Sequence, residues 1–82
     1  MASESLNGVI QPYDYEQPLV ANAIPANGYP SGAAACSITV RRFGNANWVI
    51  QELTTWGTVR KWARSTNNAG TSWSTWREFS ML

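Results

Sequence analysis

The sequence predicts a mainly β fold: a small antiparallel meander of about four strands with an extended, proline-rich N-terminal segment, in a chain that is expected to oligomerise. Three observations support this. All four prolines lie within residues 1–32, so no helix of ordinary length fits between them. After Gly32 the prolines stop, and β-branched and aromatic residues follow in runs bounded by turn formers. With one cysteine and no histidine, the 82 residues have neither a disulfide nor a closed zinc site to stabilise a small core, which favours oligomerisation.

We expect one domain in two parts. Residues 1–32 form an extended entry segment packed on the sheet, with room for short strands at residues 8–10 and 19–21. Residues 33–82 form the β knob, with strands at residues 36–43, 48–55, 59–64 and 73–79. Residues 44–47 connect the first pair, Gly57 marks a tight turn between the second and third strands, and residues 66–70 lead to the fourth.

The last stretch leaves an alternative open. Trp73, Trp76, Phe79 and Leu82 are spaced by three residues, as on one side of a helix, and Thr75 with Glu78 has the spacing of a capping box. A strand is favoured here because the stretch is short and rich in serine, threonine and tryptophan, which are middling helix formers.

Period-two alternation predicts apolar side chains on both faces of the sheet. Cys36, Ile38 and Val40 share one face, whereas Phe43 lies on the other. In the last strand Trp73 and Phe79 would share a face, with Trp76 on the opposite one. A single small sheet buries one face, so the second needs the entry segment, another subunit or a ligand as its cover.

Two local motifs have structural interpretations. The segment from Thr66 to Trp73 resembles the Asp-box hairpin of sialidases and other β proteins, with Asn68 at the aspartate position, Gly70 in the strained conformation and Trp73 as anchor. Arginine side chains are also expected to stack on indoles. The arginines in question are Arg60, Arg64 and Arg77, and the indoles are Trp62, Trp73 and Trp76.

Charge and composition argue against several functions. A net charge of +1 is low for a nucleic-acid binder, although Arg41, Arg42, Arg60, Lys61 and Arg64 with Trp62 leave a single-stranded nucleic-acid platform as a less favoured interpretation. The longest apolar runs are too short for membrane insertion. Without histidine there is no Ser-His or Cys-His pair, and Cys36 is expected to be a small buried hydrophobe. Asp14 and Glu16 form a possible carboxylate pair but are typical of ordinary surface.

Clustered tryptophans indicate either packing or carbohydrate recognition, in which a sugar stacks on an exposed indole and polar side chains bind its hydroxyls. We assign Trp73, Trp76 and Phe79 to the core or an interface. The candidate receptor contacts are Trp48, Trp56, Trp62, Arg64, Asn67 and Asn68.

Short motifs spread over residues 26–79 follow one another in a recognisable order. They are Ala26-Asn27-Gly28-Tyr29-Pro30, the strand Ile38-Thr39-Val40, Gln51, Arg60 with Trp62-Ala63-Arg64, and the closing Trp73-Ser74-Thr75-Trp76-Arg77-Glu78-Phe79. Together they resemble the pyocin-knob type of small β domain found in bacteriophage tail fibres and R-type pyocin fibres. Trp62 departs from the pattern, where tyrosine or phenylalanine is commoner, and residues 11–19 form an insertion.

The resemblance implies a trimeric fibre with the knob near its receptor-facing end. We therefore expect a knob domain of a phage or phage-like tail fibre or tailspike, exposed on the virion and attached to the rest of the fibre, that binds a bacterial surface polysaccharide. We expect no enzymatic activity and no cofactor. Two alternatives remain open: a trimerisation or spacer module without a ligand, and an accessory domain of a depolymerising tailspike.

Overall fold

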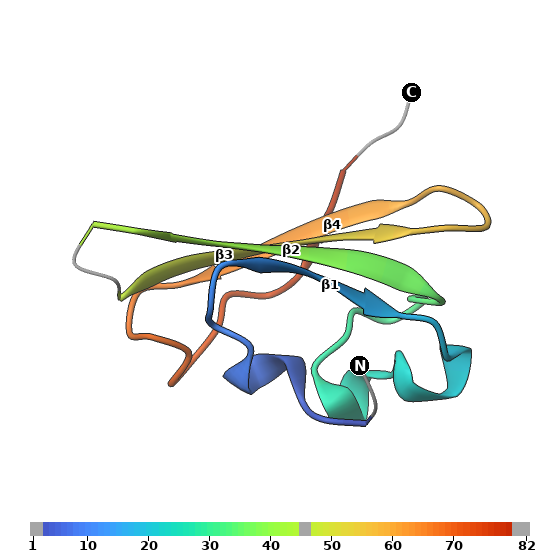
Figure 1. Cartoon of the computed structure of the whole chain (residues 1–82), viewed down its shortest axis with the longest axis horizontal. Coiled ribbons are helices and arrows are strands. Elements are labelled where there is room, and N and C mark those ends of the chain that lie inside the picture. Colours follow the sequence, from blue (N-terminus) through green and yellow to red (C-terminus); the bar gives the residue numbers. More distant parts are fainter. Residues whose placement is uncertain (1–2, 45–46, 80–82) are drawn as a thin grey trace.

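The computed structural model describes residues 3–44 and 47–79. They form one antiparallel sheet of five strands in which each strand pairs with the next along the chain (Figure 1). The mainly β fold class is confirmed, with five strands instead of about four. The strands are β1 (Tyr13–Gln17), β2 (Cys36–Phe43), β3 (Trp48–Thr55), β4 (Lys61–Thr66) and β5 (Arg77–Glu78).

The observed strand bounds agree with the predicted ones in the middle of the sheet and differ from them at its edges. The bounds of β2 and β3 are confirmed, but β4 begins and ends two residues later than expected, and β5 keeps only two of the seven predicted residues. Residues 73–79 form no helix, and Leu82 lies outside the described residues. The expected short strands at residues 8–10 and 19–21 are absent from the described chain. β1 instead lies within residues 11–19, the segment identified above as an insertion.

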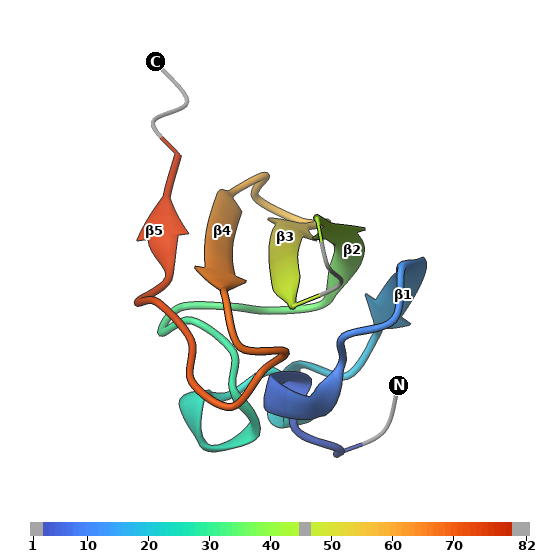
Figure 2. The same ribbon diagram turned by 90° about the vertical axis from the view of Figure 1, so that its left-hand side faces the viewer.

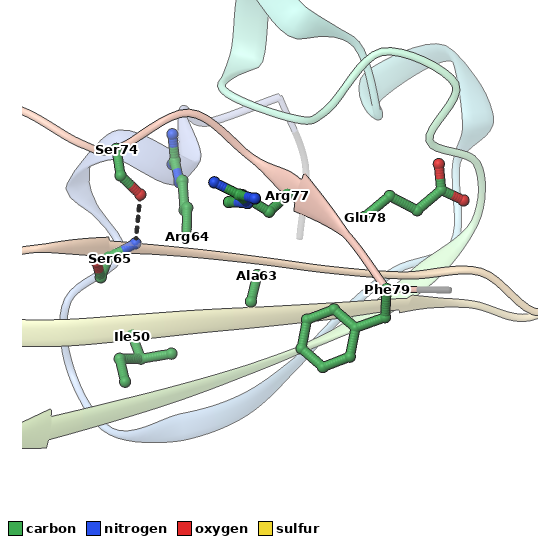
Figure 3. Close-up of a pocket in the computed structure, with 8 residues that line it drawn as sticks. All are labelled: Ile50, Ala63, Arg64, Ser65, Ser74, Arg77, Glu78 and Phe79. Carbon is green, nitrogen blue, oxygen red and sulfur yellow. Dashed lines mark hydrogen bonds between the residues drawn. The ribbon is translucent and has the colours of Figure 1, made fainter. Parts of the chain in front are cut away.

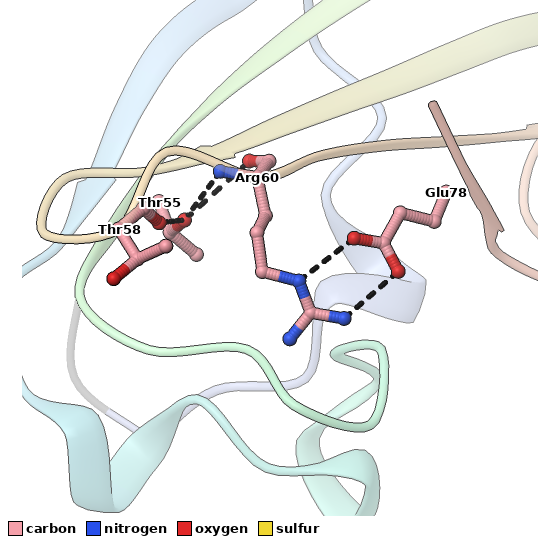
Figure 4. Close-up of polar contacts among 4 residues, drawn as sticks. All are labelled: Thr55, Thr58, Arg60 and Glu78. Carbon is pink, nitrogen blue, oxygen red and sulfur yellow. Dashed lines mark hydrogen bonds and ion pairs between the residues drawn. The ribbon is translucent and has the colours of Figure 1, made fainter. Parts of the chain in front are cut away.

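The start of β4 is delayed because reversing the chain after β3 takes five residues. Thr55 holds this turn: its hydroxyl donates to the carbonyl of Thr58 at 2.6 Å and accepts from the amide of Arg60 at 2.9 Å (Figure 4). The tight turn predicted at Gly57 was wrong, because the connection takes five residues and Gly57 does not adopt a positive φ. The β2–β3 connection does begin with a left-handed glycine, Gly44 at φ +61°, while Asn45 and Ala46 lie outside the described residues.

One face of the sheet, the inner face, is covered by the N-terminal part of the chain (Figures 1 and 2). That part contains β1 and three short 3₁₀ helices: η1 (Leu6–Gly8), η2 (Val20–Asn22) and η3 (Pro25–Asn27). The alternating burial of β2 and β3 places every second side chain on this face, as the period-two pattern predicted. The buried apolar residues are Leu6, Ala23, Tyr29, Cys36, Ile38, Val40, Val49, Leu53 and Trp62.

Gln51 fastens the N-terminal segment to the centre of the sheet. Its side chain is fully buried, and its amide nitrogen donates to the carbonyls of Leu6 at 2.7 Å and Val9 at 2.8 Å. Its amide oxygen accepts from the Nε of Arg64 at 2.8 Å. A buried amide that fulfils its donors and its acceptor in this way stabilises the particular arrangement that provides them.

The guanidinium of Arg64 lies between two indoles on the inner face. It is 4.4 Å from the ring centre of Trp73 and 4.6 Å from that of Trp76. The two indole nitrogens donate to the carbonyls of Asn7 at 3.1 Å and Gly28 at 2.8 Å. Both tryptophans therefore face the inner side, and the expected alternation of Trp73 and Trp76 across a continuous strand was wrong. The stacking of arginine on tryptophan is confirmed here and by Arg60 over Trp62 at 4.6 Å.

The turn after β4 has the hydrogen bonds that its sequence predicted. The Thr66 hydroxyl accepts from the amides of Asn68 and Gly70, and the Asn68 side chain accepts from the amide of Ser72 at 3.0 Å. Gly70 has a φ of +88°, and an added Cβ would lie 3.0 Å from the Asn7 carbonyl oxygen. The turn is thus closed by its own side chains and packed tightly on η1.

Candidate functional site

The opposite face of the sheet, the outer face, is left uncovered by the part of the chain that the structure describes (Figure 1). The strand register places the even-numbered residues of β3 and the odd-numbered residues of β2, β4 and β5 on it. Large apolar side chains remain exposed there, with Trp48 at 52% and Phe79 at 44% of their full accessible area. Phe79, just after β5, faces the same way. The outward residues are thus Ser37, Thr39, Arg41, Phe43, Trp48, Ile50, Glu52, Thr54, Lys61, Ala63, Ser65, Arg77 and Phe79.

Two adjoining hollows run beside β4, and we call them together the β4 trough. The larger has a volume of about 460 Å³ and contains Phe79 and Arg77 (Figure 3). The smaller, of about 290 Å³, contains Trp48 and Asn67. Ser65 and Ser74 line both hollows, so the two hollows adjoin at these residues. The remaining lining residues are Ile50, Ala63, Arg64, Thr66, Ser72, Trp73 and Glu78.

The strand register fixes the aromatic ends of the trough. Trp48 lies one residue beyond the pair formed by Val49 and Thr66, and the Phe79 amide donates to the Lys61 carbonyl at 2.8 Å. About six residues of strand separate these levels, which is roughly 20 Å at about 3.3 Å per residue. The trough thus carries an exposed aromatic side chain at each end and hydroxyl groups between them.

The C-terminal wall of the trough is fixed by backbone and side-chain hydrogen bonds to β4. The Ser74 amide donates to the Ser65 carbonyl at 2.8 Å, and the Ser65 amide donates to the Ser74 hydroxyl at 3.0 Å. Further along, the two residues of β5 pair with Trp62 and Ala63. Residues 75 and 76 leave the sheet between these contacts, because Trp76 stacks on Arg64 from the inner side.

An ion pair fixes β5 against the turn that precedes β4. Arg60 donates to both carboxylate oxygens of Glu78, from Nε at 2.7 Å and from Nη2 at 2.8 Å (Figure 4). These hydrogen bonds hold the pKa of Glu78 below its usual range and raise the pKa of Arg60. The Glu78 carboxylate points away from the Phe79 ring (Figure 3). Both partners are therefore charged at neutral pH and directed toward each other.

The predicted contact residues divide between the trough, the core and other places. Trp48 and Asn67 line the trough, while the Asn68 side chain is used inside its own turn. Trp56 is 45% exposed but lies at the other end of β3, where its indole nitrogen donates to the Ser37 hydroxyl at 2.8 Å.

Trp62 and Arg64 are inner-face side chains, which explains why they are not exposed as a contact surface. They retain 4% and 7% of their accessible area, because the register sets them beside Leu53 and Gln51 over the core. Burial lowers the pKa of Arg64 to about 10, so the guanidinium stays charged at neutral pH between its two indoles. A single-stranded nucleic-acid platform would need these side chains on one face of the sheet. Instead, Arg41 and Lys61 face outward while Arg64 and Trp62 face inward.

Several lining residues were not identified from the sequence. Phe79 was assigned to the core or an interface but is exposed, and Ser65, Ser74 and Arg77 were not selected. The available signal was the alternation of β4, in which Ala63 and Ser65 face away from the buried Trp62. Arg77 follows from the same parity, because it pairs with Ala63.

The remaining reactive groups lie away from the trough. Asp14 and Glu16 are exposed on the outward side of β1, beside a hollow that Ser37 and Thr39 also line. Cys36 is fully buried under the sheet, and burial raises the pKa of its thiol to about 11, which keeps it protonated at neutral pH. Within residues 3–44 and 47–79, no three histidine, cysteine, aspartate or glutamate side chains gather as a metal site requires. None of the helices in this part of the chain has the length and apolarity needed to cross a membrane.

Comparison with protein families, with curated proteins and with solved structures found no match for this chain.

Proposed function

We propose that this chain is the knob domain of a phage or phage-like tail fibre or tailspike, and that it attaches to a bacterial surface polysaccharide through the β4 trough. The observation that carries the proposal is the placement of Trp48 and Phe79, both exposed, at the two ends of two adjoining hollows with hydroxyl groups between them. The motif order along residues 26–79 adds the link to tail fibres.

The chemistry of the trough suits a sugar chain. Exposed aromatic rings provide apolar surface on which the C–H faces of pyranose rings stack, while small polar groups beside them bind hydroxyls. Ser65 and Ser74 line both hollows between the rings, and Asn67 lines the smaller hollow with Trp48. Trp48 and Ser65 lie in strands of the sheet, and the backbone amides of Ser74 and Phe79 donate to carbonyls of β4. The site is therefore formed before the ligand binds, which reduces the ordering cost of binding.

The proposal includes a homotrimer within the parent fibre. Phe43 and Tyr13 remain exposed outside the trough, and apolar side chains of this size are suited to contacts between copies. Three troughs on one shaft would convert a modest affinity for a single sugar segment into strong attachment through avidity. A trimer that binds no polysaccharide would instead indicate the alternative, a trimerisation or spacer module.

The proposal is tested by binding of the 82-residue chain to an array of purified bacterial capsular and O-chain polysaccharides, together with its mass in solution by light scattering. Trp48→Ala should reduce the affinity for the bound polysaccharides about tenfold or more, as the loss of an aromatic anchor does. Trp56→Ala is the matched control, because it removes an indole of similar exposure from the far end of β3. Absence of binding to every polysaccharide, or equal losses for the two variants, would contradict the proposed site.

A further inference from the structure

The charges around the β4 trough are unevenly distributed. Arg77 lines the trough and is exposed, and among the described residues it forms no ion pair. Lys61 lies beside it, with its ammonium 5.7 Å from the ring centre of Phe79. The end of the trough that Phe79 occupies is therefore bordered by two cations with no carboxylate between them.

The nearest acidic group on the trough is already neutralised. Glu78 belongs to the lining, but Arg60 binds both of its oxygens and holds its charge on the side away from Phe79 (Figures 3 and 4). On the outer face itself, Glu52 of β3, the strand next to β4, pairs with Arg41 of β2 at 3.6 Å. Neither carboxylate thus cancels the charge of Arg77.

Of the other acidic residues, Asp14 and Glu16 lie in β1 at the opposite edge of the sheet, and Glu4 lies before η1 in the segment that covers the inner face. Asp14 and Arg77 belong to one cross-strand row, which runs from β1 through Thr39, Glu52 and Ala63 to β5. Four steps between strands separate them, or roughly 19 Å at about 4.8 Å a step. This exceeds the Debye length of about 8 Å at physiological ionic strength, so the acidic edge is screened from the trough.

We infer that the polysaccharide recognised by the trough is acidic, and that a carboxylate of one sugar residue binds the guanidinium of Arg77 at the Phe79 end. This inference rests on the proposed function and names the chemical class of its ligand. A guanidinium presents two parallel N–H donors that match a carboxylate, and this geometry distinguishes a uronic acid from a neutral hexose. Trp48, about 20 Å away at the other end, supplies the stacking contact that a neutral sugar residue also satisfies.

The test compares native acidic polysaccharides with the same polymers after chemical reduction of their carboxylates to primary alcohols. The wild-type chain should bind the native polymers more tightly, and this preference should weaken between about 0.1 M and about 1 M salt, where the Debye length falls from about 10 to about 3 Å. Arg77→Gln should lower the affinity for the native polymers about ten- to a hundredfold, the range for a hydrogen bond to a charged group. It should leave binding of the reduced polymers unchanged.

Arg41→Gln is the matched control, since it makes the same change of charge on the same face but two strands away from β4. Thermal unfolding of each variant shows that it is folded. If the reduced polymers bind as well as the native ones, or if Arg77→Gln and Arg41→Gln behave alike, the acidic ligand is refuted while the trough and its Trp48 contact stand. If no polymer binds in either form, the proposed function falls together with this inference.

Discussion

Replacing Gln51 by leucine tests whether one buried amide holds the N-terminal segment on the sheet. Gln51 makes three hydrogen bonds in the interior: two to the carbonyls of Leu6 and Val9, and one from the guanidinium of Arg64. A net worth of about 1 kcal/mol for each neutral bond and about 2 kcal/mol for the bond to the charged group gives about 4 kcal/mol. The greater hydrophobicity of leucine offsets about 1 kcal/mol of this loss.

We therefore expect Gln51→Leu to lower the free energy of unfolding by about 3 kcal/mol, which is a large share of the roughly 4–12 kcal/mol typical of a domain of this size. The midpoint of thermal unfolding should fall by about 12–24 °C, at about 4–8 °C per kcal/mol. Urea unfolding followed by tryptophan fluorescence measures the change, because Trp62 is buried in the native state.

Glu52→Leu provides the control for Gln51→Leu. It places the same residue at the next position of β3, on the outer face, where it removes only a partly exposed ion pair with Arg41. Pairs of this kind contribute at most about 1 kcal/mol. A loss below about 1 kcal/mol for Gln51→Leu, or one no larger than that of the control, would refute the argument that these hydrogen bonds fix the segment.

Two further predictions concern the buried thiol and the turn after β4. Burial raises the pKa of Cys36 to about 11, so the unfolded chain loses this proton at a lower pH than the folded chain. The contribution of this group to the free energy of unfolding is complete below about pH 8 and is lost as the pH rises toward 11. Urea unfolding at about pH 8 and about pH 10 should therefore show a smaller fall in the free energy of unfolding for Cys36→Ala than for the wild type. Gly70→Ala should destabilise the domain by about 1–3 kcal/mol, since φ is +88° and the new Cβ would lie 3.0 Å from Asn7 and Ile10. Gly8→Ala, where an added Cβ meets nothing within 4 Å, should change stability by less than about 0.5 kcal/mol in the same thermal assay.

The central strands were predictable because their own residues determine them. In β2 and β3 the side chains alternate between buried and exposed, and turn formers bound both runs. β1 was not predictable in this way. Its sequence, Tyr-Asp-Tyr-Glu-Gln between Pro12 and Pro18, contains no β-branched residue, and its pairing joins Tyr13 to Val40, far along the chain. Such a strand depends on tertiary contacts that local propensity does not describe.

The candidate site was only partly predictable, again because some of its residues are positioned by tertiary contacts. Trp48 and Asn67 follow from the strand and turn patterns around them, but Phe79 depends on where the last strand begins. A continuous strand over residues 73–79 places Trp73 and Phe79 on one face. In the structure the contacts of Trp73 and Trp76 with Arg64 draw residues 73–76 to the inner side, and only Arg77 and Glu78 pair with β4. Trp73 therefore lies on the inner side while Phe79 projects outward, a separation that results from a stacking interaction that sequence spacing alone does not specify.

The distribution of the tryptophans changes the argument for a trimer. Trp62, Trp73 and Trp76 are covered within one chain, by the N-terminal segment and by the guanidiniums of Arg60 and Arg64, so the core needs no second copy to shelter them. The indoles that remain exposed, Trp48 and Trp56, lie on the outer side of β3. Close packing of another subunit over the trough would remove water from the serine hydroxyls and from Arg77, which is costly unless each finds a new partner. A hydrated sugar chain supplies such partners along its length. The trough is thus better suited to the proposed polysaccharide than to a subunit interface, and the contacts of the proposed trimer are expected on the apolar residues that lie outside it.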